Sequence, residues 1–397
     1  MQKPAIEGGK PVRENFLVFG KPDIRKEEIK EVFDTLKSGW IGQGPKVEEF
    51  EEEFRKYIGT KNAVAVNSCT AGLFLALEVI GIEEGDEVIV PVFTFPATAN
   101  VVVHHKATPV FCDVDIRTGN ITPEEVKRKI TPKTKAIIMV HFAGMPCRVD
   151  EIKEIAEEND IYLIEDAAHA IEAWYKKKKI GTTAHLSAFS FYATKNLTTA
   201  EGGMVTTESD EWAEEIRIKR LHGISKHAWS RYRMEGFLFY ETLYAGYKMN
   251  MTDIQASLGI HQLRRIEKNL KKREELWNLY TDAFLNNPFL EVFHKEWSPH
   301  IKHAMHLYTI LLKTERLKIT REQFIKAIKR ENIGVGIHFI PLHWHKFYKN
   351  GFKKGDFPNA DYLGERIVSL PLSPWMSKKD AEDVIKAVDK ITQYYAC

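Results

Sequence analysis

The stretch KAIIMVHFAGMPCRVDEIKEIAEENDIYLIEDA, residues 135–167, decides the fold class. It begins with an apolar run long enough for a buried strand and continues with VDEIKEIAEEND, in which apolar residues recur at helical spacing. It ends with a second apolar run, IYLIEDA. A strand, an amphipathic helix and another buried strand in this order are typical of a parallel strand pair joined by a crossover helix. The stretch therefore predicts an α/β protein.

Five further apolar runs between about residues 60 and 206 alternate with helical patterns in the same way. We expect each to be a buried strand: AVAV (63–66), EVIVPV (87–92), TPVFCDV (108–114), LSAFSF (186–191) and GGMVTT (202–207). The whole set predicts one large, mostly parallel sheet of seven strands, sandwiched by helices. The glycine pair that opens the last run predicts a tight turn into its strand.

At 397 residues the chain is too long for one simple core, which indicates two domains. We expect a large domain over residues 1–250, a long connecting helix over residues 251–286, and a smaller C-terminal α+β domain over residues 287–397. The large domain should start with two amphipathic helices, KPDIRKEEIKEVFDTLKSG (21–39) and GPKVEEFEEEFRKYIG (44–59), each closed by glycine.

Composition narrows the class of protein. Charged residues make up 28% of the chain and hydrophobic residues 44%, which is typical of a folded globular protein, and the formal net charge of +2 argues against a dedicated nucleic-acid binder. The four cysteines are scattered and form no CxxC pair, which favours a reducing compartment and no zinc site. The N-terminal residues lack the apolar core of a signal peptide, and no window approaches the ~20 apolar residues of a membrane helix. We therefore expect a cytoplasmic protein without a membrane partner.

Ligands of such sheets bind at the carboxyl ends of the strands, so the residues there are candidate site residues. NSCTAGLFLAL (67–77) is a strand end followed directly by a helix. The free amides of a helix start, together with the Thr70 hydroxyl, suit a phosphate group. An ordinary Ser or Thr cap explains the same segment if it is taken alone. Neither GxGxxG nor a Walker loop occurs in the chain.

A carboxylate and a lysine follow two other strands. Asp166, in LIEDAAHA (163–170), ends a buried strand, where a carboxylate needs either a protonated ring nitrogen or an Arg or Lys beside it. Lys195, in FSFYATKNLTTAEGG (189–203), would by itself be an ordinary surface lysine. With Phe95 and Thr70 at further strand ends, the set supplies what a pyridoxal phosphate enzyme needs: a Schiff-base lysine, an acid for the pyridine nitrogen, an aromatic group on the ring and a phosphate cradle.

Seven stretches in order carry a resemblance to a known family. They are SGWIGQGPKVEEFEEEF (38–54), NSCTAGLFLAL (67–77), GDEVIVPVFTFPATANVV (85–102), IEDAAHAIEA (164–173), FSFYATKNLTTAEGGMV (189–205), GYKMNMTDIQASLG (246–259) and SLPLSPWMS (369–377). The chain resembles the DegT/DnrJ/EryC1/StrS family of sugar aminotransferases, which share the fold-type I aspartate aminotransferase architecture. The resemblance covers essentially the whole length.

The resemblance implies a role for each matching position. Lys195 would form the Schiff base with pyridoxal 5'-phosphate and move the proton in catalysis, and Asp166 would pair with the pyridine nitrogen. The other implied cofactor residues are Phe95 against the ring, His169 in place of a glutamine beside the phenolic oxygen, and Thr70, the Ala71 amide and Ser190 around the phosphate.

Lys248 departs from the commonest family pattern. Many members have GYNYR where this chain has GYKMN (246–250), and their asparagine reaches the phosphate of the neighbouring subunit's cofactor. Lys248 stands in that place, as in relatives that aminate the 4-position of the sugar; it would either replace the amide with a charge or lie at the surface. Because the family's active sites borrow residues from a second subunit, the resemblance implies a homodimer with shared active sites.

Several weaker signals concern the substrate. Arg231, in HGISKHAWSRYRMEG (222–236), suits a nucleotide diphosphate or belongs to a solvated loop. Trp40 and Ile41 line the active-site entrance, if they follow the matching stretch of relatives; for Trp40, packing in the core is the alternative. His343, in IHFIPLHWHKFY (337–348), borders the sugar site or is a packed histidine. A metal site there lacks a nearby carboxylate or cysteine, so we expect no metal.

The expected function is transamination. L-glutamate would give its amino group to the cofactor, leaving pyridoxamine 5'-phosphate, and the amine would pass by ping-pong Schiff-base chemistry to a keto-sugar linked to a nucleotide diphosphate. EDAAHA with GYKMN looks most like members that aminate 4-keto UDP or dTDP sugars for amino-sugar and surface polysaccharide biosynthesis. The alternatives are a 3-keto-sugar aminotransferase, a sugar dehydratase of the same family, which carries histidine where this chain has Lys195, and a non-catalytic regulator.

Overall fold

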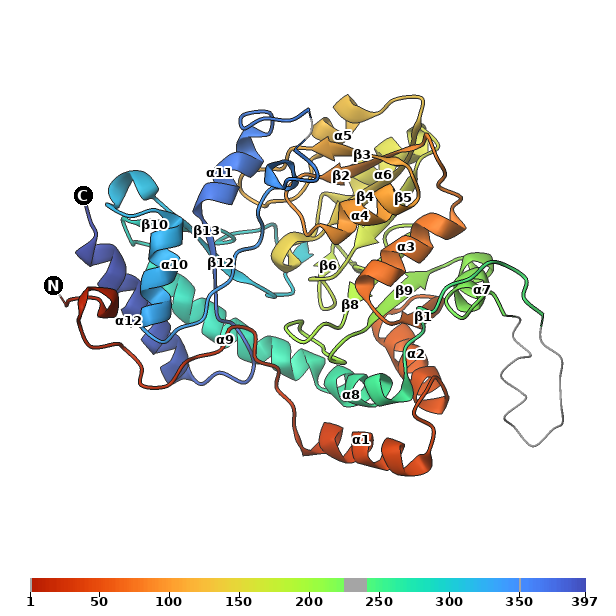
Figure 1. The fold of residues 1–397 in the computed structure, drawn as a ribbon, viewed down its shortest axis with the longest axis horizontal. Helices are drawn as coiled ribbons and strands as arrows, with labels where there is room; N and C mark the ends of the chain where they lie inside the picture. The colour runs from red at the N-terminus through yellow and green to blue at the C-terminus, as the bar shows by residue number, and fades with distance from the viewer. Residues whose placement is uncertain (1, 225–240, 350) are drawn as a thin grey trace.

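The seven predicted strands form one sheet in the computed structural model, which describes residues 2–224, 241–349 and 351–397 (Figure 1). The strand order is β1-β9-β8-β5-β4-β2-β3. Their bounds are β1 (Asn62–Val66), β2 (Glu87–Pro91), β3 (Thr108–Cys112), β4 (Thr134–Val140), β5 (Tyr162–Asp166), β8 (Leu186–Ser190) and β9 (Gly203–Thr207). The predicted α/β class and the seven-stranded sheet are confirmed.

One strand of the sheet runs against the others. β9 is antiparallel to both of its neighbours, β1 and β8, whereas β2 to β5 and β8 pair in parallel. The connection from β8 to β9 contains no crossover helix, so the chain can return only in the opposite direction. As a result, the carboxyl ends of β1, β2, β5 and β8 meet at one edge of the sheet, and β9 starts there.

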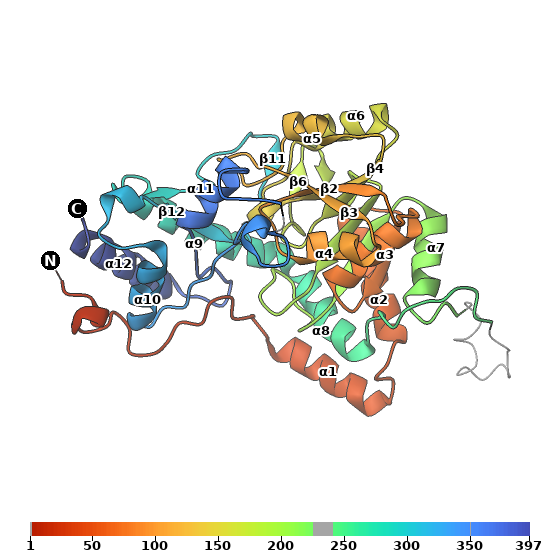
Figure 2. The same cartoon turned by 45° about the horizontal axis from the view of Figure 1, so that its top comes forward.

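Helices flank this sheet (Figures 1 and 2). Four of them have side-chain caps, because Ser68, Thr122, Ser209 and Thr252 each accept a hydrogen bond from the backbone N–H three residues further on. The helices are α2 (Pro45–Ile58), α3 (Cys69–Val79), α4 (Ala97–His104), α5 (Pro123–Lys129), α6 (Val149–Glu158), α7 (Asp210–Lys219) and α8 (Asp253–Arg264). α3 packs across β8 and β9, which places its first turn at the edge where the strands end.

A second hydrophobic cluster surrounds a smaller antiparallel sheet, which lies with α10 and α12 at the end of the molecule that holds both termini (Figures 1 and 2). Its strands are, in order, β10 (Leu290–Val292), β12 (Tyr308–Leu312) and β13 (Ile367–Leu370). The remaining helices and short strands are α9 (Ile266–Phe284), α10 (Arg321–Arg330), α11 (Pro358–Arg366), α12 (Lys378–Tyr394), β6 (Trp174–Tyr175), β7 (Lys178–Lys179) and β11 (Ile301–Lys302). Single 3-10 turns are η1 (Ala5–Glu7), η2 (Phe142–Gly144), η4 (Thr314–Arg316) and η5 (Leu342–Trp344).

Two details differ from the predicted domain layout. The connecting segment is two helices, α8 and α9, because the backbone leaves helical geometry at Arg265 (φ −114°, ψ 10°), whose guanidinium pairs with buried Glu28. The start of the chain packs on the C-terminal unit: Leu17 belongs to the second hydrophobic cluster, and the backbone N–H groups of Ala5 and Val12 donate to the Glu331 carboxylate at 2.7 and 2.8 Å. The first residues therefore do not pack with the large sheet.

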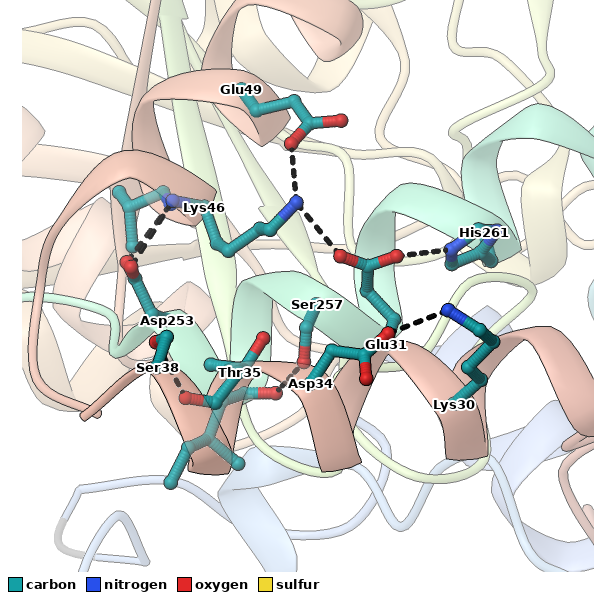
Figure 3. A network of polar contacts seen from close by, with 12 residues as sticks. Lys30, Glu31, Asp34, Thr35, Ser38, Lys46, Glu49, Asp253, Ser257 and His261 are labelled. Atoms are coloured by element: carbon teal, nitrogen blue, oxygen red, sulfur yellow. Dashed lines mark hydrogen bonds and ion pairs between the residues drawn. The ribbon is translucent and has the colours of Figure 1, made fainter. Parts of the chain in front are cut away.

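The first long helix, α1 (Lys26–Ser38), is held to the body by polar contacts (Figure 3). Glu31 accepts from Lys46 of α2 at 2.7 Å and lies 3.0 Å from His261 of α8. Its larger apolar side chains point the other way and are exposed: Ile29, Phe33 and Leu36. Spaced at helical intervals, they form one outward apolar stripe.

Candidate active site

A cavity of about 560 Å³ opens at the edge where the parallel strands end. Six of the residues that the sequence predicted for the cofactor line it: Thr70, Phe95, Asp166, His169, Ser190 and Lys195. They come from the segments that follow β1, β2, β5 and β8, so the parallel sheet brings together residues that are far apart in the sequence.

Lys195 lies in the turn after β8, where its backbone N–H donates to the Tyr192 carbonyl at 2.9 Å. No hydrogen bond or ion pair joins its side-chain amine to any residue that the structure describes. Burial lowers the pKa of Lys195 to about 8, against the opposing pull of Cys69 and Asp166. About a tenth of the amine is therefore uncharged at pH 7, far more than for an ordinary lysine, and the uncharged amine is the form that acts as a nucleophile.

Asp166 is buried at the end of β5 and faces the same cavity. Its carboxylate accepts from the Thr98 hydroxyl at 2.9 Å and from the Ala168 N–H at 3.2 Å. Burial raises its pKa, while these two hydrogen bonds and the nearby Lys195 lower it. No Lys or Arg of the described chain forms an ion pair with it. Of the two partners that the sequence allowed, a salt bridge to a Lys or Arg is thus not formed within the described residues, and the protonated ring nitrogen stays a prediction.

The preceding carboxylate, Glu165, points to the opposite face of the sheet, as alternation along a strand requires. It accepts from the Gly181 N–H at 2.9 Å and from the Ser187 hydroxyl at 2.5 Å, and the Thr183 hydroxyl donates to its other oxygen. Glu165 therefore anchors the segment between β5 and β8 and does not reach the cavity.

The first turn of α3 forms the floor of a possible anion site. Ser68 is the N-cap, and its hydroxyl accepts from the Ala71 N–H at 3.1 Å. The Ala71 amide is thus engaged by its own helix cap, and its contact with the phosphate stays a prediction. The amides of Cys69 and Thr70 have no acceptor among the described residues, and the Thr70 and Ser190 side chains line the cavity beside them. Two free amides and two hydroxyls at a helix start suit a phosphate.

The glycine pair after Lys195 has a different role from the predicted turn. Neither Gly202 nor Gly203 has a positive φ. A Cβ on Gly203 would lie 2.6 Å from the carbonyl carbon of Ser68 and 2.7 Å from the nitrogen of Cys69. Gly203 is therefore required because β9 starts directly against the backbone of the α3 cap.

His169 and Phe95 complete the walls that a planar ring would touch. The Nδ1 atom of His169 accepts from the Ala143 N–H at 3.1 Å, so the neutral ring carries its proton on Nε2 and is a hydrogen-bond donor there. Burial, Lys195 and His306 hold its pKa well below the usual range, which keeps the ring neutral. Phe95 is 59% exposed, although it lines the cavity, and so offers an uncovered aromatic face.

The comparisons with known proteins agree with this arrangement. The model of the DegT/DnrJ/EryC1/StrS aminotransferase family matches residues 22–389. The chain belongs to this aminotransferase family.

The protein is similar to other members over almost its whole length. It is 55% identical over 382 residues to an uncharacterised protein of Methanocaldococcus jannaschii, covering 96% of this chain and 98% of that one. It is 49% identical over 386 residues, with the same coverage, to the spore coat polysaccharide biosynthesis protein SpsC of Bacillus subtilis. Among solved structures, the putative sugar aminotransferase Spr1654 of Streptococcus pneumoniae in its PLP form superposes with a TM-score of 0.89 at 33% identity, over 96% of this chain and 99% of that one.

This aminotransferase has cavity residues that the sequence did not assign to the site. His338 and Phe339 line it from the C-terminal part of the chain. The Nδ1 of His338 lies 2.8 Å from the Ser369 hydroxyl, and burial, with Lys195 nearby, lowers its pKa to about 3. His306, which was also missed, is not among the residues that line the cavity, but its ring centroid lies 4.4 Å from that of His169, which does line it. These residues follow no periodic pattern that could have marked them.

Four predicted substrate or cofactor residues lie outside the cavity of this single chain. His343 is buried with its Nε2 2.9 Å from the Asp361 carboxylate, which fits the packed-histidine alternative. Trp40 and Ile41 are 40% and 51% exposed, so core packing does not explain them. The Lys248 amine donates to the Asn250 side-chain oxygen at 2.5 Å.

Arg231 lies outside the described residues. Within the described ranges, no helix is long and apolar enough to cross a membrane, and no group of three or more His, Cys, Asp or Glu side chains is arranged to hold a metal ion.

Proposed function

We propose that this family member is a pyridoxal phosphate-dependent aminotransferase that moves the amino group of L-glutamate onto a keto-sugar linked to a nucleotide diphosphate. The observation that carries the proposal is the pairing of Lys195 and Asp166 across one cavity. Among the described residues, a lysine with a lowered pKa and no hydrogen-bond or ion-pair partner lines the same cavity as a buried carboxylate that forms no ion pair with a Lys or Arg. When bound, pyridoxal phosphate supplies a ring that accepts electrons from the carbon losing its proton.

Residues from several elements would bind the parts of the cofactor. Asp166 keeps a ring nitrogen protonated, because a buried carboxylate is stabilised by that positive charge. The free amides of the first α3 turn, with the hydroxyls of Thr70 and Ser190, hold the phosphate. His169 donates its Nε2–H to an oxygen on the ring, and Phe95 covers one face.

Lys195 is the general acid and base of both half-reactions. Its Nζ would take a proton from the substrate carbon that carries the amino group and return one to the cofactor carbon that is bonded to the same nitrogen. A pKa of about 8 suits this task, because the amine exchanges protons readily near neutral pH. The dehydratase alternative is disfavoured, since Lys195 stands where those relatives carry histidine.

The sugar is a 4-keto UDP or dTDP sugar in this proposal, and the product serves amino-sugar and surface polysaccharide synthesis. The GYKMN segment (246–250) and the similarity to a spore coat polysaccharide biosynthesis protein support this choice. The 3-keto-sugar aminotransferase remains the alternative. The four cysteines form no disulfide, which suits work in the cytoplasm.

A homodimer is part of the proposal. The outward stripe of α1, with the exposed Trp40 and Ile41 beyond its end, is an apolar surface that the single chain leaves uncovered. A second subunit on this surface would bring further side chains, with Lys248 as a candidate, to the neighbouring cavity.

An absorbance spectrum of the purified protein tests the reaction. A visible band that bleaches with L-glutamate and is absent from Lys195→Ala supports the proposal. A colourless wild-type protein that also fails to take up added pyridoxal phosphate would overturn it. Product analysis with matched 3-keto and 4-keto nucleotide sugars then decides the carbon that is aminated.

A further inference from the structure

A chain of buried polar side chains lies behind Lys195. Arg273 of α9 and Glu172, which follows β5, form a fully buried ion pair. The second oxygen of Glu172 accepts from the side-chain amide of Asn196 at 2.8 Å, and Asn196 is the residue directly after Lys195. We call Arg273, Glu172 and Asn196 the relay. The roles proposed above leave these three residues unexplained.

The relay fixes the orientation of the Asn196 amide. Its Nδ2 donates to the Glu172 carboxylate and to the Ala304 carbonyl at 3.0 Å, and neither of these acceptors can donate. The Asn196 Oδ1 therefore has to face the other way, where His306 Nδ1 lies at 2.9 Å. An amide oxygen can only accept, so His306 carries its proton on Nδ1 and its Nε2 is unprotonated.

His169 has the opposite tautomer, because its Nδ1 accepts from the Ala143 N–H. Ala143 also contacts His306, because the His306 backbone N–H donates to the Ala143 carbonyl at 3.1 Å. The two rings lie 4.4 Å apart with 36° between their planes. One ring thus offers a donor and the other an acceptor, and neither Nε2 is hydrogen-bonded to a described residue.

We propose that His306 is a further positioning residue of this active site: the relay holds it as the Nδ1–H tautomer, and its ring packs against His169 and so steadies that ring, which carries Nε2–H and lines the cavity beside Lys195. Both rings are buried and neutral, and the charge of Lys195 opposes protonation of either one. The relay thereby ties the backbone next to Lys195 to the hydrogen-bond donor that the proposed ring oxygen would use. Only the kinetic consequence rests on the proposed function.

Nitrogen-15 NMR of histidine-labelled, full-length protein tests the tautomers directly. We expect the Nδ1–H pattern for His306 and the Nε2–H pattern for His169, with His306→Gln and His169→Gln to assign the signals. His185 serves as an internal reference, because its Nδ1 accepts from the Leu163 N–H at 3.0 Å and predicts Nε2–H independently. An Nε2–H signal from His306 in the wild type would overturn the proposal.

Two matched double variants test whether the relay sets the tautomer. E172Q/R273M and E172M/R273M both remove the buried charges together, so neither leaves an unpaired ion. They differ in one respect: the glutamine side chain of the first variant would still accept from the Asn196 amide, and the methionine side chain of the second would not. We expect His306 to keep Nδ1–H in the first variant and to become a mixture of tautomers in the second. The same tautomer in both would show that the relay does not control His306.

The kinetic readout is the single-turnover reaction with L-glutamate. E172M/R273M should react about ten-fold more slowly than E172Q/R273M, the effect of losing about one hydrogen bond, with similar glutamate KM values. Equal rates despite different tautomers would overturn the positioning role. If wild-type protein does not react with glutamate, the proposed function fails, and the NMR comparison still decides the tautomer.

Discussion

Gly203 provides the sharpest test of how the phosphate site is built. Replacing it with alanine would place a Cβ 2.6 Å from the Ser68 carbonyl carbon and 2.7 Å from both the Ser68 oxygen and the Cys69 nitrogen. Ordinary contacts of a Cβ begin at about 3.4 Å, so the α3 cap has to move by several tenths of an ångström. Overpacking of this kind costs about 1–3 kcal/mol. The movement also displaces the free amides of the first α3 turn.

The expected result for Gly203→Ala has two parts. The free energy of unfolding should fall by about 1–3 kcal/mol, measured by denaturant titration without cofactor. Affinity for added pyridoxal phosphate, measured by absorbance titration, should fall by about ten-fold or more, because a hydrogen bond to a charged group contributes about 1.5–3 kcal/mol.

Gly42→Ala is the matched control. Gly42 also lacks a positive φ, and a Cβ there would meet no atom within 4 Å. Its alanine variant should keep wild-type stability or gain a few tenths of a kcal/mol through the unfolded state, roughly as in compatible Gly-to-Ala changes. If Gly203→Ala unfolds at the same denaturant concentration as Gly42→Ala and binds pyridoxal phosphate equally well, the close approach of β9 to the α3 cap does not shape the site.

Three further outcomes follow from the buried titratable groups. Asp166→Asn should still bind pyridoxal phosphate but react with glutamate at least about a hundred-fold more slowly in single-turnover assays, because the neutral amide no longer favours the protonated ring nitrogen; an unchanged rate contradicts this role. The rate at which cofactor-free protein combines with added pyridoxal phosphate should level off above a pH of about 8, where Lys195 has lost its proton, and a rate still rising at pH 10 contradicts the lowered pKa. Burial lowers the pKa of His294 to about 4 in the folded protein, whereas the same side chain in the unfolded chain has its ordinary pKa of 6.5. As the pH drops below 6.5, the unfolded chain therefore binds a proton that the folded protein does not, and the free energy of unfolding falls. The loss at this site should be about 2 kcal/mol between pH 7 and pH 5, measured by denaturant titration, and a His294→Gln variant with the same pH dependence refutes it.

Most of the seven strands could be predicted because they are buried along nearly their whole length and are therefore mainly apolar runs between turn residues, although the edge strand β3 is exposed or half-buried at its start. The direction of β9 could not, since it depends on the missing helix between β8 and β9 and on pairing with β1, from the other end of the sheet. The break at Arg265 has a similar origin. The local sequence holds no glycine or proline at the break, and the contact that Arg265 makes there is with Glu28, more than two hundred residues earlier.

The candidate site likewise contains residues that the sequence could predict and residues that it could not. Lys195 and Asp166 could be found because parallel strands place their carboxyl ends at one edge, so chemistry at several strand ends converges. The hydrogen bond from the Ala71 amide to the Ser68 hydroxyl could not be predicted, because a helix start does not reveal which amides its own cap occupies. His338 and His343 stand on an irregular segment, where no period of 2 or 3.6 tells which side chain faces the cavity.

The ion pair of Glu172 and Arg273 is better explained by geometry than by stability. Burying two charges costs about as much as their attraction returns, and the Nη1 of Arg273 has no hydrogen-bond partner in the described parts of the chain. The pair fixes the position of the Glu172 carboxylate, which can only accept hydrogen bonds. The group that donates to it is the side-chain amide of Asn196, the residue after Lys195. A well-packed apolar pair would fill the same space but leave this amide free to turn over.

The segment that carries His306 explains why such a fixed point is needed. Ala304 and Leu307 belong to the hydrophobic cluster of the large sheet, whereas Met305 and Tyr308 belong to the cluster of the small sheet. His306 therefore lies in a segment whose residues pack alternately in the two hydrophobic clusters. A movement of one cluster relative to the other would rotate its ring. Because the relay joins α9 to the segment after β5, it resists that shift at the position where the rings of the two histidines meet.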